Sequence, residues 1–259
     1  MAINLDKITI TQVDEIMAFN NAKELEFIMD EVTDVTISNA EEKTDITGRG
    51  GRVIGSLKKN KTVTISGTNG LIVGGALAAM TGGTVTSGTN RIRKTEVVTV
   101  KSNTATLTGE PTGTVGNEIG YAYIKNANGS LDMDKKLTQD ADASAEGTFS
   151  FADGTLTFYT GAVPDNTEVV VFYDSEVESA AVDNVSDKYS KTLEMYIDVT
   201  CQDNCDNLYH GQFIIPRADF NGTFDITIGS DPSTQAFECS SIAGGCTGSN
   251  KLWDFIIFE

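Results

Sequence analysis

Hydrophobic and polar residues alternate along much of this chain, and the alternation predicts β-strands. Residues 192–199 show it most clearly, because Leu193 and every second residue after it are apolar, whereas the residues between them are not aliphatic. Residues 223–228 repeat the pattern. Shorter versions occur at residues 8–10, 35–37 and 63–65. Thr is the usual polar partner, and β-branched residues fit a pleated sheet, so propensity and pattern agree.

Turn-forming residues separate the predicted strands. The pairs Asn128-Gly129 and Asp153-Gly154 tolerate the positive φ that tight turns require. We expect Asn20–Lys23 to join two early strands, and Lys58–Asn60 to form the basic tip of a hairpin. Leu71–Met80 is the segment that best fits a helix, although it contains two glycines.

The middle of the chain differs from its flanks. From residue 95 to residue 179 the predicted strands are short and close together, and the nearly apolar run Glu168–Asp174 follows them. We interpret residues 95–179 as a β module inserted into a core formed by residues 1–94 and 180–259; one continuous sheet system is the alternative. The expected fold is all-β, a sandwich or barrel-like core with one short helix and this inserted module.

The last strand is apolar on both faces, which is unusual for a chain end. Such a strand must be covered on both sides, either within a sandwich or by a neighbouring subunit. Both interpretations remain open at this point. The candidate subunit contacts are the terminal-strand residues and the predicted hairpin tip: Trp253, Phe255, Ile257, Lys58, Lys59, Asn60 and Lys61.

The charge balance limits the possible partners. The chain has 19 Lys and Arg against 37 Asp and Glu, a net charge of −18. Proteins that grip nucleic acid neutralise phosphates with cations, and anionic membranes need cations too, so both are disfavoured partners. High net charge also keeps a protein soluble. With no basic, apolar start visible at the N-terminus, we expect synthesis in a cytoplasm.

Catalytic motifs are not evident in the sequence. The single histidine, His210, has no Ser-His-Asp or Cys-His arrangement at a recognisable spacing. The glycine-rich segment Gly48–Arg52 lacks the Lys-Ser/Thr of a phosphate-binding loop, so we expect it to be a turn. We therefore predict a protein that is not an enzyme and has no cofactor.

Four cysteines are the remaining candidates for chemistry. They are Cys201 and Cys205, spaced C-x3-C, and Cys239 and Cys246, spaced C-x6-C. The first spacing suits a structural zinc site and the second is loose. Disulfides and unlinked buried thiols are the alternatives. We expect no metal, with zinc on these four cysteines as the exception to test.

Several segments resemble phage tail tube (major tail) proteins. They are Asp45–Gly48, Val53-Ile54 and Lys58–Ile65 in the N-terminal half; Lys125–Leu131, Lys135–Leu137 and Glu168–Tyr173 in the inserted region; and Phe213–Ala218, Phe220–Ile226 and Leu252–Ile257 in the C-terminal half. The resemblance touches most of the chain.

The resemblance implies a subunit that joins six-fold into rings, which stack into the tail tube of a virion assembled in the bacterial host cytoplasm. It implies self-association and contact with tape measure, terminator or sheath proteins. DNA would pass through the lumen without specific binding, and acidic walls would repel it within about 8 Å at physiological salt. Neither catalytic residues nor a cofactor are implied.

Other assembled β proteins are the alternatives. A virion decoration subunit or the tube subunit of a contractile injection system would share most of these features. A surface adhesin or carbohydrate-binding module belongs to a different class and would require export and exposed aromatic residues. The chain has one Trp, in its apolar last strand. Contractile and flexible tails both remain open.

Overall fold

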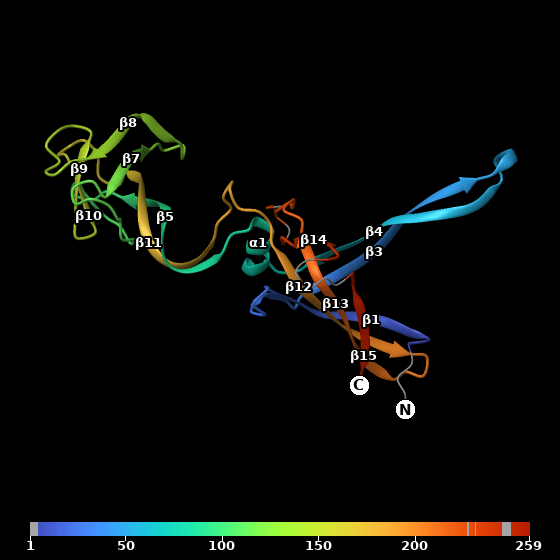
Figure 1. Ribbon diagram of the computed structural model, residues 1–259. Helices are drawn as coiled ribbons and strands as arrows, with labels where there is room; N and C mark the ends of the chain where they lie inside the picture. Colours follow the sequence, from blue (N-terminus) through green and yellow to red (C-terminus); the bar gives the residue numbers. More distant parts are fainter. Residues whose placement is uncertain (1–4, 227, 231, 245–249) are drawn as a thin grey trace. The chain divides into compact units, whose positions relative to one another are not determined.

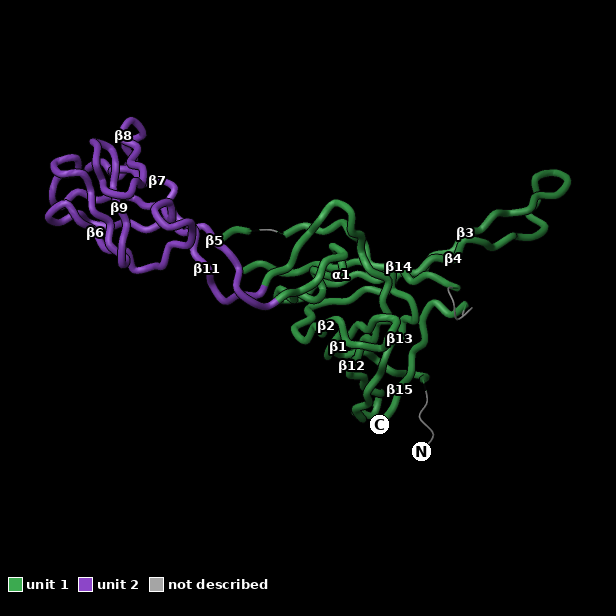
Figure 2. The backbone as a smooth tube through the Cα atoms, turned by 60° about the vertical axis from the view of Figure 1, so that its left-hand side comes forward, with its two compact units in different colours: residues 1–86, 181–259 green, residues 87–180 purple. Residues whose placement is uncertain are grey.

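The computed structural model describes residues 5–226, 228–230, 232–244 and 250–259 of the chain (Figure 1). They confirm an all-β fold: 15 strands form an eight-stranded and a seven-stranded sheet, and one short α-helix accompanies them in this part of the chain. The chain divides into two compact units, one formed by residues 1–86 and 181–259 and the other by residues 87–180 (Figure 2).

The first unit is built on the eight-stranded sheet, in the order β2-β1-β12-β13-β14-β4-β3, with β15 also paired to β13. Its described elements, in chain order, are β1 (Ile8–Phe19), β2 (Leu25–Met29), β3 (Val32–Thr47), the 3-10 turn η1 (Arg49–Gly51), β4 (Val53–Asn69), α1 (Gly74–Thr81), β12 (Thr192–Asp203), β13 (Leu208–Phe220), β14 (Gln235–Ser241) and β15 (Asp254–Phe258).

One hydrophobic core holds these strands together. The predicted alternation in residues 192–199 is confirmed, because Met195 and Ile197 of β12 are buried with Ile65 of β4 and Phe237 of β14. The helix predicted at Leu71–Met80 is confirmed from Gly74 to Thr81, and Ala76 and Ala79 pack on the same core. Strands from both halves of the sheet thus enclose a common interior.

The predicted hairpin at Lys58–Asn60 is wrong. β4 runs through these residues without a break, and the chain reverses at Gly48–Arg52, which confirms the turn expected there. Asn60 does adopt a positive φ of 52°, but it lies where the β3–β4 register shifts, at a β-bulge. The bulge absorbs the extra residue, so the ribbon continues past Asn60.

The strand predicted at residues 223–228 is also wrong. The described residues 223–226 are irregular, Ile228 is exposed, and residue 227 lies outside the described part. The amide of Thr223 donates to the side chain of Asn221 at 3.0 Å, which forms a turn directly after β13. β14 pairs with the end of β13 instead, with Ala218 opposite Ser241.

The second unit has the strand order β5-β11-β7-β8-β9-β10-β6. Two of its strands, β5 (Val85–Thr99) and β11 (Glu168–Val182), begin or end in the first unit. The other strands are β6 (Thr104–Thr106), β7 (Ile119–Lys125), β8 (Leu131–Gln139), β9 (Thr148–Ala152) and β10 (Thr155–Phe158). The turns predicted at Asn128-Gly129 and Asp153-Gly154 are confirmed by positive φ angles of 86° and 75° at the two glycines.

A polar network ties β5 to β11 in this unit. The carboxylate of Glu96 accepts hydrogen bonds from the Thr108 amide (2.7 Å), the Thr108 hydroxyl (2.8 Å), the Tyr173 hydroxyl (2.9 Å) and the Gly109 amide (3.4 Å). Burial raises the pKa of Glu96, but these bonds outweigh it and the net shift is downward. Burial and the neighbouring carboxylate raise the pKa of Tyr173 to about 12.

Candidate assembly surfaces

The exposed side of strands β1, β12, β13 and β15, named the open face here, is built by strand alternation. Because Leu193, Met195 and Ile197 point into the core, the residues between them point the other way. The register aligns these outward residues in rows across the four strands. One row runs Gln12, Thr200, His210, Phe258; the next Glu15, Asp198, Gln212, Ile256; and the third Met17, Tyr196, Ile214, Asp254.

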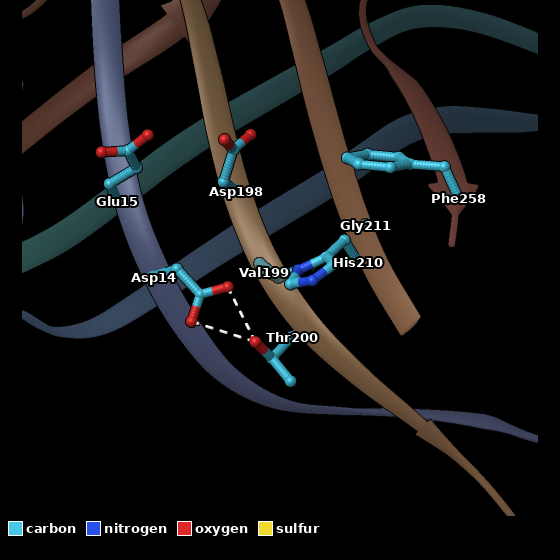
Figure 3. Close-up of a pocket in the computed structure, with 8 residues that line it drawn as sticks. All are labelled: Asp14, Glu15, Asp198, Val199, Thr200, His210, Gly211 and Phe258. Atoms are coloured by element: carbon cyan, nitrogen blue, oxygen red, sulfur yellow. Dashed lines mark hydrogen bonds between the residues drawn. The ribbon is translucent and has the colours of Figure 1, made fainter. Parts of the chain in front are cut away.

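Carboxylates gather in a hollow at one end of the open face (Figure 3). Asp14 accepts hydrogen bonds from the Thr200 hydroxyl at 2.8 and 3.1 Å, and Asp198 accepts one from the Gln212 amide at 2.8 Å. Neither aspartate, nor Glu15 beside them, forms an ion pair with any described residue. Neutral donors orient these groups without cancelling their charge, so the hollow is a site of negative potential.

The opposite end of the open face is more apolar. Phe19 and Tyr196 meet edge to face with centroids 5.6 Å apart. The Tyr196 hydroxyl donates to Glu194 at 2.7 Å, and this bond with burial raises the tyrosine pKa to about 12. Burial raises the pKa of Glu194, but its bonds to Lys23 and Tyr196 lower it more. Here, unlike in the hollow, a lysine compensates the carboxylate.

β15 is an edge strand, so the central position considered from the sequence is wrong. It pairs with β13 from Ile214 opposite Asp254 to His210 opposite Phe258, and no described strand pairs with its other edge. Ile256 and Phe258 are 49% and 44% exposed. β14 pairs only with the last residues of β13, so the same side of β13 is free at its other end to pair with β15. An unpaired strand with exposed apolar side chains is a template for another chain.

The predicted contact residues of this strand differ in orientation. Phe255 stacks on Phe213 with centroids 4.2 Å apart and planes 20° apart, and it packs against the core. Ile257 lies opposite Gly211 and is partly buried, whereas Trp253 is 39% exposed.

The far edge of the same sheet is open as well. β2 pairs with residues 16–19 of β1, and no described strand pairs with its outer side. The first half of β1 has β12 as its only described strand partner. Leu25 and Ile28 of β2 are 50% and 40% exposed.

Residues 38–62 form an exposed two-stranded ribbon, named the arm here, at the end of the β3–β4 hairpin (Figure 1). It contains six Lys and Arg against three Asp and Glu, although the whole chain has a net charge of −18. Exposed ion pairs cross it, such as Glu41–Lys58 at 2.9 Å. Its exposed aliphatic residues are Ile46, Val53, Ile54 and Leu57. The arm is therefore a cationic and apolar part of an acidic chain.

The predicted contacts Lys58, Lys59, Asn60 and Lys61 lie in the middle of the arm, at its bulge, and not at its tip. Arg49 and Arg52 are at the tip instead. Sequence reasoning missed the open face, because its rows join residues about 190 positions apart. The alternation in residues 192–199 places Glu194 and Asp198 on the face opposite the apolar residues, but it does not identify their neighbours on the other strands.

The cysteines are separated by burial. Cys201 and Cys239 are buried in the core of the first unit, Cys205 is exposed in the β12–β13 turn, and Cys246 lies outside the described residues. The three described cysteines are free thiols. Burial raises the pKa of Cys239 to about 12. Within the described ranges, no group of three or more His, Cys, Asp or Glu side chains is placed to hold a metal ion.

Comparison with known proteins assigns the chain to a family. No curated protein matches the sequence. Among the described residues, no helix is long and apolar enough to cross a membrane. Residues 8–251 match the model of the YomU/Tube protein family, which covers nearly the whole chain. The resemblance noted from sequence is thereby confirmed: the chain belongs to the YomU/Tube protein family of phage tube-type structural proteins.

Proposed function

We propose that copies of this chain join edge to edge into rings, six to a ring, and that the rings stack into a tail tube whose lumen is lined by the open face. The observation that carries this proposal is an unpaired strand on each side of the open face, β15 on one side and β1 with β2 on the other, with an acidic surface between them.

Ring closure follows from strand addition. If β15 of one copy pairs with the β1–β2 edge of the next, each contact uses two different edges and leaves one of each free for further copies. Such head-to-tail contacts close into a ring when the rotation allows, and closure leaves neither of these two edges free. Ile256 and Phe258 of one copy and Leu25 and Ile28 of the next would then be removed from water. Their burial would give the contact an apolar component.

The open face suits a conduit for DNA. Each subunit contributes three unpaired carboxylates, Asp14, Glu15 and Asp198. Phosphates that approach such a wall are repelled, and no cation in the hollow would hold them. DNA would therefore pass through without being retained. The charge of the hollow, more than the charge of the whole chain, supports this role.

The arm suits contact between rings. Its surplus of basic residues favours the acidic surface of another copy, and its aliphatic residues would be buried there. Lys58, Lys59, Asn60 and Lys61 are the proposed contacts in its middle, and Trp253, Phe255 and Ile257 those near the β15 edge. In a phage tail the tube would also contact tape measure, terminator or sheath proteins.

Electron microscopy of designed variants tests ring closure. Ile256→Lys with Phe258→Lys places charge on both half-exposed positions of β15 and spares the Phe255 stack. We expect a folded protein without rings. The matched control is Val115→Lys, an exposed apolar residue of the second unit, and it should assemble as the unaltered chain does. Rings formed by the β15 variant would refute closure through this edge.

Shortening the arm separates ring formation from stacking. Replacing residues 42–59 with Asn-Gly keeps the paired base of the hairpin. Rings should form and fail to stack into tubes. If full-length tubes form without the arm, the proposed axial contact is wrong while ring closure stands.

Charge reversal tests the lining. Glu15→Lys with Asp198→Lys should make assembled tubes retain fluorescent duplex DNA, and raised salt should release it. Glu110→Lys with Glu146→Lys adds the same charge at exposed residues of the second unit, which are not part of the open face. DNA retention by this control, or none by the first variant, would contradict the assignment.

A further inference from the structure

The second unit presents a strip of aromatic rings on the exposed side of its sheet. Tyr121 and Tyr123 of β7 lie opposite Phe172 and Val170 of β11. The neighbouring residues Val169, Val171 and Tyr173 of β11 are buried in the core of the unit, so these four side chains lie on the other side. Val170 is covered, and the three rings are only partly buried.

The rings form one connected surface. The centroids of Tyr121 and Phe172 are 5.4 Å apart with planes tilted by 37°, and Tyr123 meets both edge-on at 5.6 and 6.4 Å. Lys136 of β8 places its Nζ 4.9 Å from the centroid of Tyr121. Neither tyrosine hydroxyl in this strip has a hydrogen-bond partner among the described residues. These hydroxyls are therefore available to a ligand.

Paired charges border the strip along β11. Two residues before Val170, Glu168 accepts a hydrogen bond from Lys125 at 2.6 Å. Two residues after Phe172, Asp174 pairs with Arg93 at 2.6 Å and with Arg91 at 3.2 Å. Each pair holds donors and acceptors within reach of the rings, since alternate residues of a strand are about 7 Å apart. The strip thus combines ring surface with directed polar groups.

We propose that this strip binds a pyranose oligosaccharide. A sugar ring has an apolar C–H face that can stack on an aromatic side chain, and a rim of hydroxyls that charged and phenolic groups can hydrogen-bond. Tyrosine supplies rigid, amphipathic contact area at low entropic cost. The function is separate from tube assembly and would let an assembled tube adhere to a glycan surface.

Two other occupants fit the strip less well. Single-stranded nucleic acid also stacks on aromatic rings, but the second unit has seven Lys and Arg against fourteen Asp and Glu, a net charge of −7. A protein partner needs about 800 Å² on each side, and three partly buried rings bordered by charges are a much smaller surface.

Calorimetric titration of the full chain tests the proposal. The probes are maltohexaose, cellohexaose and the hexamers of N-acetylglucosamine and galacturonic acid. We expect at least one to bind, and Tyr121→Ala with Tyr123→Ala to weaken it by about tenfold or more. The matched control is Tyr159→Ala, a 39% exposed tyrosine of the same unit outside the strip, which should bind as the unaltered chain does.

Three results would overturn the proposal: no binding of any probe at millimolar concentration, equal loss in the Tyr159 control, or loss of self-association in the double variant, which would make the strip a protein contact. Circular dichroism checks the fold of each variant. If the alanine variant misfolds, Tyr121→Leu keeps most of the side-chain volume and removes the ring and hydroxyl. Its binding must fall as well.

Discussion

Glu96 provides a quantitative test of how the second unit is held together. Its carboxylate accepts four hydrogen bonds, one of them from the buried hydroxyl of Tyr173. Hydrogen bonds to charged groups contribute about 1.5–3 kcal/mol each, and orphaned buried donors add a cost. We expect Glu96→Ala to lower the free energy of unfolding of this unit by about 3 kcal/mol. Glu96→Gln should cost only about 1 kcal/mol, because Tyr173 can accept from the amide.

The same group predicts a dependence on pH. The pKa of Glu96 is lower in the folded chain than in the unfolded chain, where it is about 4.3. Its ionised form therefore stabilises the fold fully above that value, and the contribution is lost as pH falls through the folded pKa. Glutamine does not titrate. The stability gap between the unaltered chain and Glu96→Gln should shrink from pH 7 to pH 3.

Hydrogen exchange measured by mass spectrometry is the appropriate assay, because peptides from β5 and β11 report the second unit separately from the first. Glu110→Gln, an exposed glutamate of the same unit, is the matched control. The free energy of opening of these peptides, obtained from their exchange rates, is the quantity to compare. The reasoning is refuted if this free energy in Glu96→Ala lies within about 0.5 kcal/mol of the control, the range typical of surface changes. If the stability difference between the unaltered chain and Glu96→Gln is the same at pH 7 and pH 3, only the predicted dependence on pH is refuted.

Three further predictions concern the first unit. Gly82→Ala should destabilise it by about 2 kcal/mol or more in urea unfolding, because φ is +74° and a Cβ would lie 2.1 Å from the carbonyl oxygen of Tyr189; an unchanged midpoint would contradict this. Met195→Ala, at a fully buried position, should cost about 2–5 kcal/mol in the same assay, and a cost below 1 kcal/mol would place this side chain outside a packed core. Iodoacetamide at pH 8 should label the exposed Cys205 and spare the buried Cys239 until urea is added; equal labelling in the native protein would show that Cys239 is accessible.

Local patterns predicted the strand content well. In residues 192–199, burial follows side-chain alternation, which depends only on extended backbone and polarity. Pairing could not be predicted in the same way. β1 pairs with β12 nearly 190 positions later, and nothing local in either strand specifies the other. The open face depends on that pairing and was therefore missed.

The two wrong elements have separate physical causes. Asn60 has the positive φ that a turn residue can adopt, but a bulge uses the same backbone conformation, and the glycines at 50 and 51 make the reversal instead. The polar and apolar residues of 223–228 alternate as they would in a strand. This pattern does not show, however, whether a neighbouring strand is available for pairing. An edge must also be free to receive it, and β14 occupies that edge of β13.

The neighbouring positions of β5 and β11 have an evolutionary consequence. The chain leaves the first unit and returns to it on adjacent strands: the Thr86 hydroxyl donates to the carbonyl of Ala181, and the Asn90 amide to the hydroxyl of Ser179. Any domain whose own ends lie side by side could replace residues 87–180 without changing the strand order of the first unit. The first unit and residues 87–180 can therefore diverge at different rates, and lineages could exchange the latter as a cassette.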